Sequence, residues 1–543
     1  MFLTALLRWW FVVLTVYILF KCISSLFATR CTPEVWGTLK TAEGESLPIT
    51  HWENIIGRTK SSDIKLSTDT ISKTQALLIR EKADKWLLKD TGSANGTYVN
   101  GKLVTSAEIT EDDEIRMGDV IASVEPAARK FNPEKTISSP WYTVFAITIF
   151  QLLSIVQLSI STNRSLSAFF PILILTAVMW GYVLFFTAMN VHGFEMEMIA
   201  FFMSTINLTV VASSEPARLK TSLIAILIGI GLMIFMCLYM RDIKRMQKLK
   251  PVLIGLSVLA MIINFAFGTV KNGAGNWIDI GGTSFQPSEI VKVAFIFIGA
   301  DTLDNLYNKR NTLVYAVFSL FCLGCLTVMS DFGTALIFLA TYLVVSFLRS
   351  GDFSRMVLSG VAVCAMGFMV LKFKPYIAKR FAAWGHVWEP DFMNDTGFQQ
   401  TRTMSYGAGG GLFGLGAGNG SLKNLEAANT DLVFGMVMEE WGLIVAVLLV
   451  MCIVAFAMFA LINVMAGRST FYTILSCGTA TMLLIQTMLN VFGSVDILPL
   501  TGVTFPFVSA GGSSMLASWA MLAYFKVSDM RENASLAVRK EVS

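Results

Sequence analysis

Histidine and charged residues are scarce in this chain of 543 residues. It has three histidines, His51, His192 and His386, and only 15% of its residues are charged. Soluble globular chains carry roughly a quarter charged residues, so an ordinary soluble enzyme is excluded. The three histidines are too far apart for the spacing of a zinc site. The net charge of +4 is small, and no nucleic-acid partner is expected.

The eight cysteines are scattered, and most of them lie in apolar runs. Cys322 and Cys325 form a C-x-x-C pair, but this pair falls in a hydrophobic segment and has no second pair to complete a metal site. We interpret the cysteines as small core residues.

Hydrophobic residues are correspondingly abundant, at 54%, which is typical of a polytopic membrane protein. The apolar stretch at residues 10–28, flanked by Arg8, is expected to be an uncleaved anchor helix, because Ala28-Thr29-Arg30 is a poor cleavage site. A cleaved signal peptide is the alternative. From about residue 140 onward, further apolar runs predict transmembrane helices. They lie near 140–160, 168–190, 198–212, 222–240, 251–270, 288–304, 312–329, 331–349, 355–373, 435–464, 471–494 and 506–526.

Residues 32–125 differ from the rest of the chain in composition. They are polar, and apolar residues alternate with polar ones, as in Ile64-Lys65-Leu66. Turn signals recur at Asn95-Gly96 and Asn100-Gly101. Short strands separated by regular turns predict an all-β sandwich inserted into a membrane chain.

Basic residues in the connecting segments predict the orientation. They are Arg241, Lys244, Arg245, Lys248 and Lys250; Lys309 and Arg310; Arg349 and Arg355; and Arg468. Because positive residues stay on the cytoplasmic side, the β domain and the C-terminal tail are expected inside, and 271–287, 374–434 and 495–505 outside. The segment 374–434 is far longer than an ordinary connection, so we expect it to be functional.

Asp431 follows Asn429-Thr430 and precedes a long apolar run that contains Glu439 and Glu440. Ionisable groups at membrane depth are costly and are usually kept for a purpose. A carboxylate at the rim of a helix can remove a proton from a hydroxyl group. The alternative is that Thr430 or Asp431 caps the helix that begins near Leu432. Helical spacing places Glu439 closer than Glu440 to the Asp431 face, where it would share a cavity or join a buried structural network.

Other polar residues allow two interpretations each. Glu289 and Lys292 are three positions apart, so they can form a neutralised ion pair on one helix face. A place beside a substrate cavity is implied only by the family resemblance given below. Asp331 sits at a turn between two apolar runs, where capping is the plainer role. The glycines between 407 and 420 lack a strand–loop–helix context, so we reject a nucleotide site and expect a tightly packed loop.

Three motifs in the β domain occur in the order and spacing of the forkhead-associated (FHA) family, whose members read phosphothreonine. They are Gly57-Arg58, Ser72-Lys73-Thr74-Gln75 and Ser93-Ala94-Asn95-Gly96-Thr97-Tyr98-Val99-Asn100-Gly101. The domain therefore resembles an FHA domain. The resemblance implies that Arg58, Ser72 and Lys73 hold the phosphate and that Asn95 binds the peptide backbone. Gln75 replaces the usual His, so an FHA fold that has lost phosphopeptide binding is the alternative.

The membrane part, roughly 195–527, contains motifs in the order of the SEDS family, the FtsW, RodA and SpoVE proteins. They are Asn272-Gly273-Ala274-Gly275-Asn276-Trp277-Ile278, Phe285-Gln286-Pro287-Ser288-Glu289-Ile290-Val291-Lys292, Ser330-Asp331-Phe332-Gly333-Thr334-Ala335, Arg380, Pro390, Gly397-Phe398-Gln399, Gly409-Gly410-Gly411-Leu412-Phe413-Gly414-Leu415-Gly416, Thr430-Asp431, Glu439-Glu440 and Phe505-Pro506-Phe507-Val508-Ser509-Ala510-Gly511-Gly512-Ser513-Ser514. The chain resembles this family of polyprenyl-linked peptidoglycan glycosyltransferases. The resemblance implies a ten-helix core, so that the anchor and the runs near 140 and 168 are about three extra N-terminal helices.

The resemblance to SEDS proteins also implies roles for individual residues. Asp431 matches the catalytic aspartate. The expected substrate-binding residues are Arg380, Gln399, Lys423, Glu289, Lys292 and Glu439. Two departures concern the substrate region: Leu425-Glu426-Ala427-Ala428-Asn429 replaces the usual Leu-Pro-Glu-Ala-His, and Arg402 stands where Gln is common. A divalent cation, Mg or Mn, would suit pyrophosphate chemistry, although no set of ligands specifies one.

The expected domains are an anchor at 1–30, a cytoplasmic FHA-like domain at 31–126, a linker with two extra helices at 127–194, a SEDS core at 195–527 and a cytoplasmic tail at 528–543. The main hypothesis is a glycosyltransferase that polymerises lipid II at the outer face of the bacterial cytoplasmic membrane. Its implied partners are a class B penicillin-binding protein and a threonine-phosphorylated protein or Ser/Thr kinase. The alternatives are a lipid II transporter (flippase) and a non-enzymatic, phospho-dependent scaffold for division or sporulation.

Overall fold

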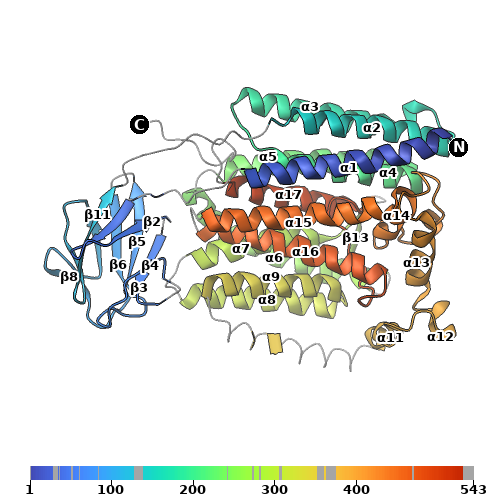
Figure 1. Ribbon diagram of the computed structural model, residues 1–543. Helices are drawn as coiled ribbons and strands as arrows, with labels where there is room; N and C mark the ends of the chain where they lie inside the picture. Colours follow the sequence, from blue (N-terminus) through green and yellow to red (C-terminus); the bar gives the residue numbers. More distant parts are fainter. Residues whose placement is uncertain are drawn as a thin grey trace.

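The structure is a bundle of long helices with a β sandwich at one end (Figure 1). It is a computed structural model, and it describes residues 2–28, 35, 37–50, 53–59, 62–82, 85–126, 139–240, 243–271, 274–280, 283–304, 309–350, 357, 360–361, 375–466 and 470–529. The predicted fold class, a polytopic helical membrane protein with an inserted all-β domain, is confirmed.

Two sheets with a core of their own form the β sandwich; their strands pair antiparallel except for the parallel pair β3–β4. One has the strand order β2-β1-β11-β10-β7-β8, and the other has the order β4-β3-β5-β6-β9. The strands are β1 Gly37–Thr41, β2 Ser46–Ile49, β3 Glu53–Gly57, β4 Ile64–Lys65, β5 Ala76–Lys82, β6 Lys85–Asp90, β7 Thr97–Val99, β8 Lys102–Val104, β9 Ser106–Ile109, β10 Ile115–Met117 and β11 Val120–Pro126. Leu39, Leu78, Leu88 and Ile115 are fully buried between the sheets, in a cluster separate from the helix bundle. Such a core is what the alternating pattern predicted.

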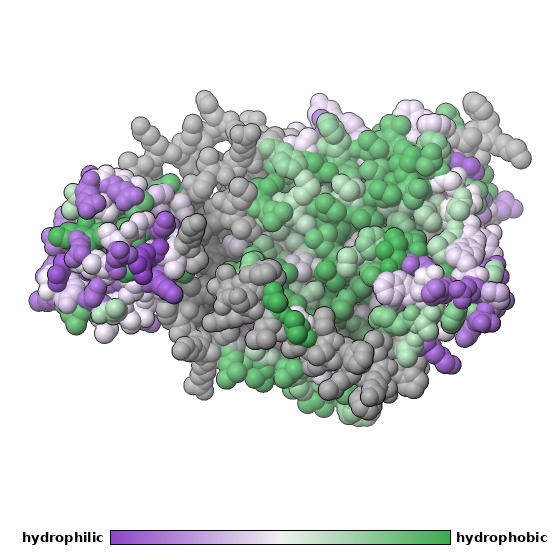
Figure 2. Space-filling view, turned by 60° about the horizontal axis from the view of Figure 1, so that its bottom comes forward, coloured by the Kyte–Doolittle hydropathy of each residue, from purple (hydrophilic) through white to green (hydrophobic). Residues whose placement is uncertain are grey.

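Eight described helices are long and apolar enough to cross a membrane. The helices of the bundle are α1 Phe2–Ala28, α2 Trp141–Thr162, α3 Phe170–Ala188, α4 Glu195–Ser214, α5 Leu219–Tyr239, α6 Ile243–Phe267, α7 Pro287–Asp304, α8 Lys309–Val328, α9 Phe332–Ser350, α15 Leu443–Ala466, α16 Thr470–Ser494 and α17 Gly512–Ser528. Figure 2 shows apolar side chains spread over the bundle and hydrophilic ones gathered on the sandwich and on the opposite end. The predicted run at 355–373 lies outside the described residues, apart from 357 and 360–361.

Helix α4 is the most enclosed element of the bundle. Every residue from Glu195 to Ser213 is buried, and α1, α2, α3, α5, α15 and α17 pack against it. The extra N-terminal helices α1, α2 and α3 are therefore part of the same packed body as the later helices.

Three predicted helix boundaries are wrong. The helix expected from 251 begins at Ile243 and contains Pro251. The other two errors arise where the backbone adopts positive φ. The run 435–464 is two helices, α14 (Val433–Trp441) and α15, because Gly442 between them has φ +91° and packs against the backbone of Gly414. Glu439 and Glu440 therefore lie on a short helix and not inside a long one. The run expected from 506 becomes helical only at Gly512, after a turn in which Phe507 has φ +60°.

The segments expected as outer loops contain regular structure of their own. Residues 271–287 overlap a three-stranded antiparallel sheet of β12 (Thr269–Lys271), β13 (Ala274–Ile280) and β14 (Thr283–Phe285). Within 374–434 lie four short elements, α11 (Pro375–Ala383), α12 (Pro390–Met393), α13 (Phe398–Gly410) and the 3-10 helix η3 (Leu422–Asn424).

These segments share one end of the bundle, which we call the distal end: β12 to β14, α11 to α14 and the turns before α9 and α17. Figure 1 shows α11, α12 and α13 at this end, together with the start of α1, whereas the β sandwich lies at the opposite end. Apart from Lys250, which pairs with Asp301 at 3.3 Å, the side chains of the orienting basic residues lie outside the described part. Which end faces the cytoplasm therefore stays a prediction.

Candidate active site

Asp431 lies in a turn directly before α14. Ala427 has φ +60°, and its carbonyl oxygen accepts hydrogen bonds from the backbone amides of Asp431 at 3.0 Å and Leu432 at 3.2 Å. No side-chain hydrogen bond caps α14, which begins at Val433. The capping alternative for Thr430 and Asp431 is therefore wrong, and the Asp431 carboxylate is available for other contacts. The helical spacing between Asp431 and Glu439 does not apply either, since Asp431 precedes the helix.

Hydrogen bonds hold the Asp431 turn against the chain that precedes α17. Asn490 of α16 donates from Nδ2 to the carbonyl oxygens of Asp431 at 2.9 Å and Val503 at 2.7 Å. The hydroxyl of Ser509 donates to the carbonyl oxygen of Thr430 at 2.7 Å. The position of the catalytic candidate is thus determined by α16 and by a loop about 70 residues further along the chain.

Arg380 of α11 approaches the same loop from the long distal segment. Its Nη1 donates to the carbonyl oxygen of Leu500 at 2.7 Å. Two residues later, Gly502 borders the carboxylate of Asp431. The opposite charges of Arg380 and Asp431 attract each other across this loop. The structure therefore brings these two predicted site residues together.

The Asp431 carboxyl group is half-buried and lies outside the membrane-spanning helices. Burial raises its pKa from the usual 3.8 to about 6, because loss of water disfavours the charged form. A hydrogen bond from Thr430 and the charge of Arg380 act in the opposite direction. At pH 7 the group is mostly ionised, yet it accepts a proton more readily than an ordinary aspartate. Both properties suit a general base.

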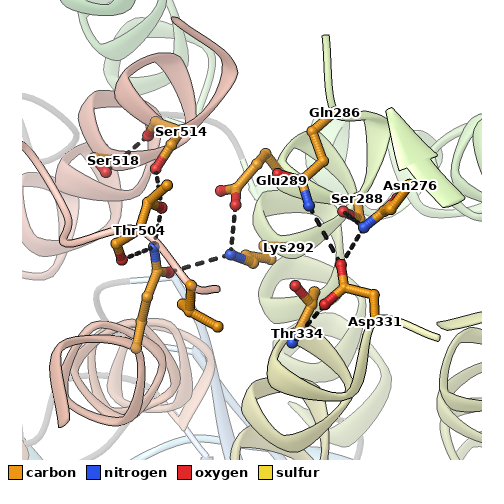
Figure 3. Close-up of polar contacts among 12 residues, drawn as sticks. Asn276, Gln286, Ser288, Glu289, Lys292, Asp331, Thr334, Thr504, Ser514 and Ser518 are labelled. Atoms are coloured by element: carbon orange, nitrogen blue, oxygen red, sulfur yellow. Dashed lines mark hydrogen bonds and ion pairs between the residues drawn. The ribbon is translucent and has the colours of Figure 1, made fainter. Parts of the chain in front are cut away.

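Glu289 and Lys292 of α7 form a buried ion pair, in which Nζ lies 2.8 Å from Oε1 (Figure 3). Lys292 also donates to Oε1 of Gln486 at 3.2 Å, and Gln486 in turn donates to the carbonyl oxygen and the hydroxyl of Thr504, each at 3.0 Å. Among the residues that the structure describes, Oε2 of Glu289 is buried and has no hydrogen-bond partner. The pair is linked through Gln486 to the loop that borders Asp431.

Asp331 belongs to a second buried cluster beside this pair (Figure 3). One carboxylate oxygen accepts the backbone amide of Thr334 at 3.0 Å and so caps α9. The other accepts hydrogen bonds from Asn276 of β13 and, at 3.3 Å, from Gln286. The capping interpretation of Asp331 is confirmed, and the same group ties the distal sheet to α7 and α9.

Lys423 stabilises the glycine-rich loop, residues 411–420, and Glu439 stabilises the turn that follows it. The Glu439 carboxylate is buried and accepts the backbone amides of Ser421 at 2.8 Å and Leu422 at 2.9 Å. Lys423 donates to the carbonyl oxygen of Gly418 at 2.6 Å. Both residues therefore set the conformation of the chain that leads to Asp431. Their direct contact with substrate stays a prediction.

Gln399 and Arg402 lie on α13, further out at the distal end. Gln399 is partly exposed, and its Nε2 approaches the carbonyl oxygen of Glu426 at 3.5 Å. The Arg402 guanidinium lies over the ring of Phe398, 5.2 Å from its centroid. Gln399 therefore contacts the segment that precedes Asp431, whereas Arg402 packs on Phe398 of its own helix.

The predicted phosphopeptide-binding residues gather on three loops at one edge of the β sandwich. Arg58 pairs with the fully exposed Asp69 at 2.6 Å, and the hydroxyl of Ser72 accepts the backbone amide of Ala94 at 2.9 Å. Asn95 donates to the carbonyl oxygen of Thr70 at 2.7 Å. Lys73 is exposed beside them. The arrangement offers a guanidinium, an ammonium group and a hydroxyl to an anion.

Gln75, where the FHA pattern usually has His, is fully buried and joins these loops. Its Oε1 accepts the backbone amide of Ser72 at 3.0 Å, and its Nε2 donates to the carbonyl oxygen of Gly96 at 3.0 Å. The glutamine thus bridges the Ser72 and Asn95 loops from within.

Sequence reasoning missed Gln486 and Asn490. Both are polar residues four positions apart in the apolar helix α16, and both are buried. Such spacing places them on one helix face, and this was the available signal. Among the described residues, no group of three or more His, Cys, Asp or Glu side chains could hold a metal ion.

Two family models match the chain. One, described as a cell cycle protein and built on FtsW, RodA and SpoVE, matches residues 188–529, and the other, an FHA domain, matches residues 54–118. The chain is 30% identical over 369 residues to the probable peptidoglycan glycosyltransferase FtsW of Bacillus subtilis. The aligned region covers 63% of this chain and 90% of that relative. It is 28% identical over 318 residues to the peptidoglycan glycosyltransferase RodA of Mycobacterium tuberculosis, with coverage of 55% and 67%.

A solved chain has the same fold as the helix bundle. It comes from a peptidoglycan synthase complex studied for the coordination of polymerization and crosslinking, with a TM-score of 0.52 and 23% sequence identity. The likeness covers 61% of this chain and 96% of that one. The match supports the arrangement of the helices.

Proposed function

Since the chain belongs to the FtsW/RodA/SpoVE family and is a glycosyltransferase, we propose that it polymerises lipid II at the outer face of the bacterial cytoplasmic membrane. The observation that carries this proposal is the half-buried carboxylate of Asp431 at the distal end. Its pKa of about 6 and the nearby charge of Arg380 support a group that takes up a proton and then releases it.

Asp431 acts as the general base. It accepts the proton of a sugar hydroxyl while that oxygen forms a bond to the anomeric carbon of the donor. The bond from that carbon to the polyprenyl pyrophosphate breaks, and the pyrophosphate leaves with the electron pair. The leaving group needs no proton if cations neutralise it, and Arg380 and Lys423 supply positive charge at the distal end.

Glu289, Lys292 and Gln399 contribute to substrate binding in this proposal. Support comes from the free Oε2 of Glu289 among the described residues and from the link between Lys292 and the Thr504 segment through Gln486. Gln399 borders the chain that leads to Asp431. A buried pair of this kind can reorganise when a phosphorylated lipid enters, because the new anion attracts the ammonium group.

The FHA domain binds a threonine-phosphorylated protein or a Ser/Thr kinase and thereby regulates polymerisation. Arg58, Ser72 and Lys73 bind the phosphate, and Asn95 binds the peptide backbone. Support comes from the exposure of Arg58 and Lys73 and from Gln75, which maintains the shape of the edge. A fork of guanidinium donors suits a phosphate dianion.

The FHA end faces the cytoplasm, and the distal end faces outward. The opposite placement of these two ends supports this orientation (Figure 1). A phosphoprotein reader needs cytoplasmic access, whereas the acceptor glycan is outside. A class B penicillin-binding protein is the proposed partner, because polymerised glycan must then be crosslinked.

One assay tests the proposal. Purified full-length protein is given labelled lipid II, with and without its transpeptidase partner, beside the variants Asp431→Asn and Asp391→Asn. Asp391 is exposed on α12 of the same distal segment and serves as the matched control. We expect polymer from the wild type and from Asp391→Asn, and a loss of at least about 100-fold with Asp431→Asn.

The other outcomes favour the alternatives. Equal polymer from the wild type and Asp431→Asn would refute Asp431 as the base. Protein-dependent movement of lipid II without polymer would favour a transporter, and neither activity would favour a scaffold.

A further inference from the structure

The start of α1 contacts the glycine-rich loop, although α1 lies outside the family match of residues 188–529. Nη2 of Arg8 donates to the carbonyl oxygen of Leu415 at 2.6 Å. The rings of Trp9 and Phe413 lie 4.0 Å apart between centroids. A charged donor and an aromatic contact on consecutive residues of α1 therefore hold the loop from outside the family core.

The loop depends on such contacts because its backbone is unusual. Gly414, Gly416 and Gly418 all have positive φ, from 77° to 94°. Glycine reaches these conformations without steric cost, but it also gains the most freedom when it is not held. A side chain at Gly416 would lie 2.6 Å from Nε2 of Gln157 in α2, so the extra helices also enclose this part of the loop.

The opposite side of the loop is attached to α14. The backbone amides of Leu415 and Gly416 donate to the carbonyl oxygens of Glu439 at 2.9 Å and Glu440 at 2.8 Å. Lys423 then donates back to Gly418 at 2.6 Å. Leu415 is thus held from two sides, by Arg8 at its carbonyl oxygen and by α14 at its amide. The loop that contains Leu415 also contacts Lys423 through Gly418.

The charge of Arg8 needs an explanation of its own. Arg8 is half-buried at the distal end, and its Nε has no hydrogen-bond partner among the residues that the structure describes. Arginine is costly in an apolar helix, and positive residues are disfavoured on the outer side of a membrane. A residue with both disadvantages is expected to have a role at the site that it touches.

We propose that Arg8 is a positioning residue for glycosyl transfer: it fixes the glycine-rich loop through Leu415, so that Lys423 is held in place for the donor pyrophosphate. The inference rests on the function proposed above. Arg8 acts through the loop and does not touch the reacting atoms. In this arrangement an N-terminal helix that the family match does not include completes the polymerisation site.

The first test is kinetic. Lipid II polymerisation is measured for full-length wild type, Arg8→Leu, Arg8→Lys and Trp10→Ala, where Trp10 is the exposed neighbour on the same helix. Loss of a charged hydrogen bond should lower kcat/KM about 10-fold to 100-fold in Arg8→Leu, mainly through KM. Arg8→Lys should recover most of the loss, and Trp10→Ala should match the wild type.

A double-mutant cycle with Lys423→Ala decides whether Arg8 acts through Lys423. The kcat/KM of the combined variant Arg8→Leu/Lys423→Ala should lie within about twofold of that of Lys423→Ala alone, because both changes remove the same contribution. Additive losses would overturn the proposed route, and unchanged kinetics in Arg8→Leu would overturn the inference while leaving the proposed function intact. A wild type that makes no polymer would overturn the function and the inference with it.

Amide hydrogen exchange gives a readout that does not depend on activity. Arg8→Leu should speed exchange at residues 415–418 at least about 10-fold relative to the wild type, while exchange in the β sandwich stays the same. Unchanged exchange at 415–418 would show that Arg8 does not hold the loop. Faster exchange throughout the chain would mark a global loss of stability and would also overturn the positioning role.

Discussion

Gly502 stands directly against the carboxylate of Asp431: a Cβ atom on this glycine would lie 3.3 Å from Oδ2. The residue has φ +72°, a conformation that side chains disfavour. Gly502→Ala should therefore shift the loop and lower the rate of lipid II polymerisation about tenfold, equal to about 1.4 kcal/mol in the barrier.

The control for Gly502→Ala is Gly511→Ala in the same loop. Gly511 has φ −132°, which any residue adopts, and its added Cβ would have only ordinary contacts. Polymer formation from labelled lipid II measures both variants. An unaffected rate in Gly502→Ala would mean that the loop and the carboxylate are not coupled.

The rate of polymerisation should depend on pH through Asp431. Burial raises the pKa of this carboxyl group to about 6, and a general base must be deprotonated. We expect a plateau above pH 7 and a decrease that approaches about tenfold per unit below pH 6. Initial rates of polymerisation between pH 5 and 8 measure this decrease. A decrease with its midpoint near pH 4 would show that the Asp431 carboxyl group is not buried as described.

Arg380 should determine the pH at which the rate of polymerisation begins to decrease. Its charge lowers the pKa of Asp431, so Arg380→Gln should raise this pKa and move the decrease to higher pH by up to about one unit. Arg402→Gln is the matched control, because Arg402 packs over Phe398 on α13. Equal midpoints in both variants would contradict the attraction between Arg380 and Asp431.

Lys292 should matter for stability because it neutralises a buried carboxylate. Lys292→Met leaves Glu289 charged and unpaired and should cost about 3–5 kcal/mol of folding free energy. The double variant Glu289→Gln/Lys292→Met should recover most of that loss in thermal unfolding of the detergent-solubilised protein. If the pair also binds substrate, the recovered double variant polymerises no lipid II, whereas full activity would assign the pair a structural role alone.

Arg58 and Asp69 should have opposite effects on phosphopeptide binding. Arg58→Ala should weaken binding of a phosphothreonine peptide about 10-fold to 100-fold, because a charged donor to the phosphate is lost. Asp69→Asn removes the carboxylate that pairs with Arg58 and should tighten binding, by no more than about fivefold.

Lys40→Ala is the control for both FHA variants, because Lys40 lies on β1 and pairs with Glu125 of β11 at 3.0 Å, so it belongs to none of the three loops. Fluorescence anisotropy with the full-length protein measures the dissociation constants. Binding that is equal in Arg58→Ala and the wild type would indicate an FHA fold that has lost phosphopeptide recognition.

The arrangement of domains followed from the sequence alone. Apolar runs long enough to span a membrane indicate helices, and the polar insert with alternating residues indicates a separate β domain. Both signals can be read locally, because each depends on the composition of one segment. The motifs around Arg58, Asn95 and Asp431 are contiguous, so they could be recognised without knowledge of the fold. The same holds for Asp331 as a cap, because capping involves neighbours in the chain.

Only the tertiary structure decided which distant residues meet. Lys292 and Gln486 are 194 positions apart, and Arg8 and Leu415 are 407 positions apart, so no periodicity could pair them. The break at Gly442 depends on close packing with the glycine-rich loop. The turn at Ala427 leaves Asp431 outside α14, and this removed the helical spacing that had related Glu439 to Asp431. The sequence by itself determined which segments are buried and which motifs are present. Packing decided which distant side chains pair and where the backbone adopts positive φ, because both depend on atoms that the local sequence does not contain.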